Sequence, residues 1–162
     1  SIIALITQTK KSYLCTTLVI HFMIKLTHHF LPFLLIFTLV LVVVKSFLIA
    51  YAGKDLCLKK YKIQSITMIL AHLQLVFGIV LLARFTFSNP NWSEIMTNSA
   101  SRYTFVEHPF AMLLAIILIS IGKVKSKKIE DNIKSAKITF TYFTIALILI
   151  LIRTPFNKLL AF

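Results

Sequence analysis

Long apolar runs, separated by short stretches rich in lysine, set the pattern of this sequence. The first run, Phe30–Tyr51, carries no charge as far as Val44 and is followed there by a single lysine, Lys45. The second run, Ile63–Phe87, is free of formal charge over its first 21 residues. Because a helix of about 20 apolar residues crosses a lipid bilayer, both runs are long enough to span a membrane unaided.

The third apolar run is too short to span a membrane by itself. Pro109–Gly122 has only 14 residues, so we expect its helix to begin earlier, with Ser99 or Ser101 as the N-cap. The predicted span is about 101–122. Pro109 is expected to kink this helix, because proline cannot donate a backbone hydrogen bond.

The fourth run, Ile138–Ile152, has 15 residues and is flanked by Lys137 and Arg153. The long stems of such flanking residues reach the membrane surface, so the predicted span is about 138–154. All four runs are apolar around the whole helix, and no series of short alternating strands indicates a barrel. The sequence thus predicts an all-α integral membrane protein, a bundle of four transmembrane helices within residues 23–162.

Residues 1–22 form a moderately apolar segment that Lys10 and Lys11 interrupt. Three interpretations stay open. In the first interpretation, the chain proper begins at Met23 and the segment is an upstream extension outside the mature protein. The segment is a signal peptide, which the absence of a small-residue cleavage site disfavours. Alternatively, it is an extra helix that lies in the membrane interface.

The composition agrees with a membrane protein. Of the 162 residues, 58% are hydrophobic and 14% are charged, whereas an average soluble domain has about 25% charged residues. The formal charge of +13 comes from lysines clustered between apolar runs, which indicates membrane topology, so no nucleic-acid partner is expected. Cys15 and Cys57 lie in different segments, without the spacing of a disulfide framework or a zinc site.

The positive charges predict the orientation, because loops rich in lysine and arginine stay on the cytoplasmic side. Five cations accompany the loop after the first span, six lie between the third and fourth spans, and five lie on the other side. We therefore expect both lysine loops in the cytoplasm, where they attract anionic lipids, and both termini on the outer side of a bacterial inner membrane. The loop cations are Lys45, Lys54, Lys59, Lys60, Lys62, Lys123, Lys125, Lys127, Lys128, Lys134 and Lys137.

Small residues indicate which helix faces pack together, since close backbone approach drives helix association in lipid. On the second helix Ala71 and Gly78 share a face, and His72 is turned about 100° away from it. On the third helix one stripe faces a neighbouring helix, and it contains His108, Ala111, Ala115 and Gly122.

Ionisable residues within the spans are functional candidates, because burying a charge in lipid is costly unless the group is paired or neutral. The candidates are the histidines His28, His29, His72 and His108. A b-type haem needs two imidazoles from different helices at similar depth. If the third helix starts near Pro109, His108 is level with His28 or His29, only one of which can face the bundle. A start near Ser99 places His108 deeper, toward His72.

Three of these histidines also have a purely structural interpretation, and the sequence leaves the structural and the functional interpretations open. His28 and His29 are then polar residues at the membrane interface, where a helix starts. His72 is then a neutral side chain that bonds to a backbone carbonyl or to a glutamine, the least costly way to bury an ionisable group.

Three further polar residues accompany the histidines: Arg102, Glu107 and Gln74. For Glu107 the sequence allows three roles. It pairs with Arg102 five residues earlier, it stabilises the start of the helix, or it orients His108 through a hydrogen bond. Gln74 lies within the second span and, like Glu107 and Arg102, is expected to support the histidine ligands without itself binding the iron.

Two strings carry a family resemblance: Ala71-His72-Leu73-Gln74-Leu75-Val76-Phe77-Gly78 and Phe105-Val106-Glu107-His108-Pro109. Over about Thr27 to Pro155 the chain resembles a family of small bacterial four-helix membrane proteins catalogued as cytochrome b-like. The resemblance implies that haem b is bound, with its iron held by His108 together with His72, His28 or His29. It also implies electron transfer to or from quinone or a partner subunit.

The competing hypothesis is a non-catalytic membrane subunit or assembly factor of a larger complex. In that case the polar residues fix the register of the helices, and the loop Asn89–Arg102 contacts a partner. Neither hypothesis gives the chain an independent catalytic activity. The sequence has no phosphate-binding loop, no HExxH motif and no nucleophile elbow.

Overall fold

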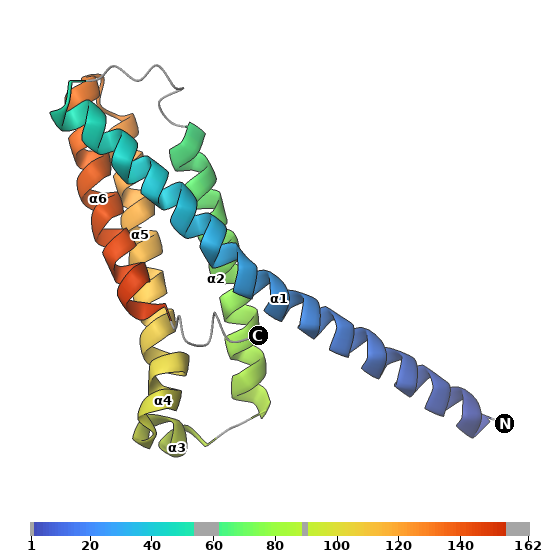
Figure 1. Ribbon diagram of the computed structural model, residues 1–162. Coiled ribbons are helices and arrows are strands. Elements are labelled where there is room, and N and C mark those ends of the chain that lie inside the picture. The colour runs from blue at the N-terminus through green and yellow to red at the C-terminus, as the bar shows by residue number, and fades with distance from the viewer. Residues whose placement is uncertain (1, 54–61, 89–90, 155–162) are drawn as a thin grey trace.

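The computed structural model describes residues 2–53, 62–88 and 91–154, and this part of the chain is helical, without a strand (Figure 1). The predicted all-α class is therefore confirmed. The helices, in chain order, are α1 (Ile2–Tyr51), α2 (Lys62–Ser88), α3 (Trp92–Thr97), α4 (Ser99–Arg102), the π-helix η1 (Tyr103–Glu107), α5 (His108–Lys127) and α6 (Asn132–Arg153).

Four helices of the described part are long and apolar enough to cross a membrane, as predicted. The second predicted span, 63–87, agrees with α2 to within one residue at each end. The third continues as helix to Lys127, and the fourth begins at Asn132, several residues before its predicted start. The lysine-rich flanks of the third and fourth spans are thus largely helical. Asp131 is the N-cap of α6, because its side chain accepts hydrogen bonds from two backbone N–H groups of the first turn.

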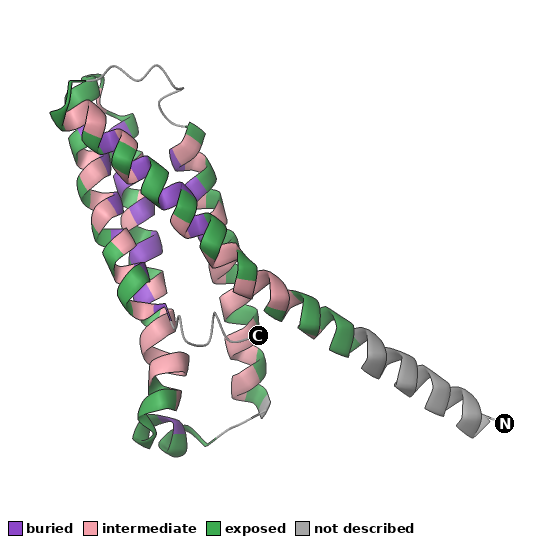
Figure 2. Cartoon of the chain, in the orientation of Figure 1, coloured by how far each residue is buried: buried purple, intermediate pink, exposed green. Residues whose placement is uncertain are grey.

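The first helix is much longer than its predicted span. α1 runs without a break from Ile2 to Tyr51, with Pro32 inside it, so residues 2–22 continue directly into the first span. Fifty residues make a helix about 75 Å long, far more than a bilayer needs. Figure 1 shows the N-terminal part of α1 pointing away from the other helices, and Figure 2 shows that its described residues are mostly exposed. Whether residues 1–22 belong to the mature chain stays a prediction.

The helices α5 and α6 form a tight antiparallel hairpin (Figure 1). Gly122 allows the close approach, because a Cβ atom at this position would lie only 2.6 Å from the Cβ of Tyr142. Ala111 and Ala115 are buried on the same stripe of α5 as Gly122. The small-residue stripe predicted from the sequence therefore forms the contact between these helices.

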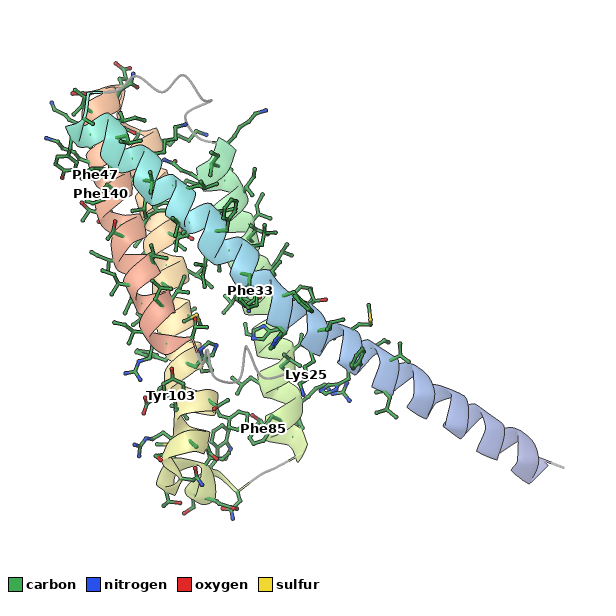
Figure 3. The ribbon with its side chains drawn as sticks, in the orientation of Figure 1. Lys25, Phe33, Phe47, Phe85, Tyr103 and Phe140 are labelled. Carbon is green, nitrogen blue, oxygen red and sulfur yellow. The ribbon has the colours of Figure 1, made fainter. Side chains whose placement is uncertain are left out.

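The core lies where α1 crosses α2 and the hairpin (Figures 1 and 2). Phe143 of α6 is its largest fully buried side chain. Figure 3 shows Phe47 of α1 beside Phe140 of α6 near the end of α1, with ring centroids 5.6 Å apart. The core cluster contains Leu35, Leu39, Val42, Ala71, Ala115, Ile116, Ile119, Phe143, Ala146 and Ile150.

A chain of buried polar groups connects α2 to the hairpin at the end of the bundle where α1 and α5 finish. We call this end the lysine end, and the opposite one the α3 end. The amide nitrogen of Gln64 donates to the Thr139 hydroxyl at 3.0 Å, and this hydroxyl donates to the Ser135 carbonyl. The Ser135 hydroxyl in turn donates to the Ser126 carbonyl at 2.8 Å. These bonds satisfy hydroxyl groups that would otherwise be buried without partners.

Candidate functional site

Side chains from the segment before α5 cap the last turn of α6, on the side of the α3 end. The final carbonyl groups of a helix have no partner within the helix itself. Here the Tyr103 hydroxyl donates to the Ile152 carbonyl at 3.4 Å, and Nδ1 of His108 lies 2.7 Å from the Arg153 carbonyl oxygen. His108 therefore faces a neighbouring helix, as predicted, and that neighbour is the end of α6.

The contact with Arg153 determines the form of the His108 imidazole. A main-chain carbonyl can only accept a hydrogen bond, so Nδ1 carries the proton and donates it. In the neutral ring, Nε2 then keeps its lone pair. A metal-binding histidine is commonly supported in this way, with a carbonyl on its other nitrogen.

Glu107, the residue before His108, joins two arginines. Its Oε2 accepts a hydrogen bond from Nη1 of Arg153 at 2.7 Å, and its Oε1 accepts one from Nε of Arg102 at 3.2 Å. The Arg102 pair is one of the roles expected from the sequence. The Arg153 pair was not anticipated, because its partners are 46 residues apart. The Arg153 guanidinium also lies 5.7 Å from the centre of the Tyr103 ring.

The π-helix η1 lies immediately before Pro109 and was not predicted. Proline has no N–H group, so the usual α-helical bond to the carbonyl of Phe105 cannot form there. The chain widens instead, and the His108 N–H donates to the Tyr103 carbonyl five residues earlier. Side chains five residues apart thereby point toward the same side of the helix. This explains how Tyr103, Glu107 and His108 all reach α6.

His28 lies where α1 crosses α2. Pro32, four residues later, cannot donate to the His28 carbonyl, and Nε2 of Gln74 on α2 supplies the missing hydrogen bond at 3.1 Å. Gly78, one turn further along α2, allows the approach, since a Cβ there would lie 3.2 Å from Cε1 of His28. The predicted polar neighbour Gln74 therefore connects α2 to the backbone of His28.

His28 of α1 and His108 of α5 are both half-buried, and they lie within range of an electrostatic interaction with each other. Nδ1 of His28 is buried without a hydrogen bond to any residue that the structure describes. A helix start near Ser99 was expected to carry His108 toward His72. The helix does start at Ser99, and its first turns extend past the end of α6 while α1 crosses obliquely (Figure 1). Which histidine pairs with His108 stays a prediction.

His72 and His29 take other positions. His72 is exposed, and its Nδ1 lies 2.7 Å from the Met68 carbonyl of its own helix, which matches the structural interpretation of this residue. The His29 ring meets the Phe30 ring edge to face, with centroids 5.8 Å apart. Since neighbours on a helix point about 100° apart, His29 lies on a different face from His28.

An aromatic stack holds α2 against η1 beside this site. The rings of Phe85 and Phe105 lie 3.5 Å apart at an angle of 8°, and Figure 3 shows Phe85 and Tyr103 on the two facing segments. Such a pair contributes about 0.5–1.5 kcal/mol beyond its buried area. It joins the α3 end of α2 to the segment that carries Glu107 and His108.

Comparisons with family models, with curated proteins and with solved structures found no match to this chain. Among the residues that the structure describes, no three histidine, cysteine or acidic side chains gather into a metal site. The candidate functional site is therefore formed by His28, His108 and the groups that support them.

Proposed function

We propose that the chain is an integral membrane electron-transfer protein that binds haem b through His28 and His108. The observation that carries this proposal is a pair of half-buried histidines on different helices, within range of an electrostatic interaction. Nδ1 of His108 is bonded to a carbonyl, and Nδ1 of His28 is buried without a described partner. Two such side chains are the donor set that a six-coordinate haem uses. Of the four histidines expected as ligands, His28 and His108 are the two that we propose.

The donor set fits haem because both imidazoles have a nitrogen to offer. His108 offers Nε2, since Nδ1 is engaged by Arg153, and Gln74 holds the backbone of His28 against α2. When bound, haem iron supplies one-electron oxidation and reduction. The protein holds the ligands and excludes water, and quinone or a partner subunit exchanges the electron.

The proposed orientation places the lysine end in the cytoplasm of a bacterial cell and the histidine pair toward the outer face of its inner membrane. The lysine-rich loops support this orientation through the distribution of positive charge. Anionic lipid headgroups then surround the lysine end, with a favourable contribution of about 1 kcal/mol for each nearby cation.

Haem content of purified variants tests the ligand assignment. His28→Ala and His108→Ala are each expected to lower the haem-to-protein ratio at least tenfold, because each removes one of the two imidazoles that would hold the iron. His72→Ala is the matched control, since that side chain is exposed and bonded within its own helix, and it is expected to retain haem. Loss of haem in His72→Ala together with retention in His28→Ala would contradict the assignment.

A second candidate function, a non-catalytic subunit of a larger complex, is favoured by the free part of α1. Leu18, Val19, Ile20, Phe22 and Met23 are all more than half exposed on a helix that leaves the bundle. In a complex these side chains contact a partner in the membrane. This function predicts that a variant beginning at Met23 loses a partner that the full chain retains during purification, and that neither form carries haem.

A further inference from the structure

We propose that Arg153 is a positioning residue for His108, and this inference rests on the proposed haem site. Arg153 contacts two consecutive residues of the neighbouring segment. Its guanidinium binds the Glu107 carboxylate at 2.7 Å, and its carbonyl accepts from Nδ1 of His108, also at 2.7 Å. The three residues form a closed ring that joins the end of α6 to the imidazole.

The ring determines where the Arg153 carbonyl lies. Arg153 is the last residue of α6, and helix termini fray readily because their last carbonyls have no helical partner. The ion pair with Glu107 holds this last residue beside His108. Releasing the guanidinium lets the carbonyl move, and His108 Nδ1 then loses the acceptor that selects its tautomer.

The π-helix makes the ring possible. On a regular α-helix, residue 108 would point about 140° away from residue 103, so Tyr103 and His108 could not both reach α6. In η1 the His108 N–H bonds to the Tyr103 carbonyl, and both side chains contact the final turn of α6. Glu107 lies between them in sequence and meets the Arg153 side chain.

Four variants of the full-length protein in detergent test the role of Arg153. Arg153→Leu and Glu107→Gln each break the ion pair, and each is expected to weaken haem binding by about 10-fold to 100-fold, as loss of a group supporting a ligand does. The double variant is expected to bind haem like either single variant, because the Arg153–Glu107 ion pair is absent from all three proteins. Glu107→Gln also breaks the ion pair with Arg102, a loss that Arg102→Leu measures by itself. Arg153→Lys keeps a cation near Glu107 and is expected to recover part of the affinity.

Arg102→Leu is the matched control, because it removes the other arginine of Glu107 and leaves the ring intact. It is expected to bind haem like the wild type. The midpoint potential of the haem that each variant retains gives a second measurement, and it is expected to shift in Arg153→Leu but not in Arg102→Leu. Wild-type affinity and potential in Arg153→Leu would overturn the inference, as would effects that add in the double variant.

Nitrogen-15 NMR of labelled histidine separates this inference from the proposed function. If the wild-type protein binds no haem, the proposed function is wrong. The tautomer of His108 then still decides whether Arg153 positions this side chain. A single tautomer with the proton on Nδ1 in the wild type, replaced by a mixture in Arg153→Leu, supports the positioning role. The same single tautomer in both proteins overturns it.

Discussion

Gly122 lies where α5 and α6 approach closely, and it gives a direct test of the hairpin. A Cβ at this position would lie 2.6 Å from the Cβ of Tyr142, and neither atom can rotate away. Overpacking costs about 1–3 kcal/mol, and the gain in helix propensity offsets about 1 kcal/mol of it. Gly122→Ala is therefore expected to lower the free energy of unfolding by up to about 2 kcal/mol.

Unfolding by sodium dodecyl sulfate in mixed micelles measures this change. Ile121→Ala is the control, because Ile121 is the exposed neighbour of Gly122, and it is expected to unfold almost like the wild type. A Gly122→Ala protein as stable as the wild type would contradict the packing of the hairpin.

Single residues show which parts of the site could be read from the sequence. The side of the helix on which His108 lies was predictable, because the spacing of His108 from Ala111 and Ala115 follows the helical repeat. The contacts of His108 and Glu107 with Arg153 were not, since they depend on how α5 and α6 are aligned. Local periodicity determines the side on which a residue lies, and tertiary packing determines its partner.

At the scale of elements, the N-terminal part of α1 is expected to be dispensable for folding. Its described residues Leu18, Val19 and Ile20 are exposed and belong to no part of the core cluster. A protein that begins at Met23 should therefore keep the helical circular dichroism per residue and the unfolding midpoint of the full chain. A large loss of stability would show that this part of α1 packs against the bundle.

The elements also show where a sequence-based expectation fails for a physical reason. The first two spans were predictable because each is a long apolar run, and the last two because their shorter apolar runs can be extended into the polar flanks. The π-helix was not, because proline at position 109 is compatible with a kink, a helix start or a wider turn, and only the contacts with α6 select among them. The length of α1 was also missed, since Lys10 and Lys11 interrupt the apolar run without ending the helix.

At the scale of the whole molecule, the distribution of lysines predicts the topology. Cys57 stands in the lysine-rich loop between α1 and α2, outside the described residues, and the Cys15→Ser variant leaves it as the single thiol. A membrane-impermeant maleimide is expected to label Cys57 only after the cells are permeabilised. Labelling in intact cells would place the lysine end outside and contradict the orientation.

The arrangement of the whole bundle explains why the histidine pairing stayed open in the sequence. The depth of His108 can be counted along its own helix, but the oblique crossing of α1 over α2 and α6 cannot (Figure 1). This crossing, with Gln74 at the His28 carbonyl, places His28 near His108. The outward side of His72 was predictable from the face shared by Ala71 and Gly78.

The most direct test of the account is a reduced-minus-oxidised visible spectrum of the wild-type protein, produced with ample haem supply and purified in mild detergent. The proposed haem site predicts the sharp bands of a six-coordinate, low-spin haem, because His28 and His108 would both ligate the iron. A flat spectrum from folded, helical protein would contradict it.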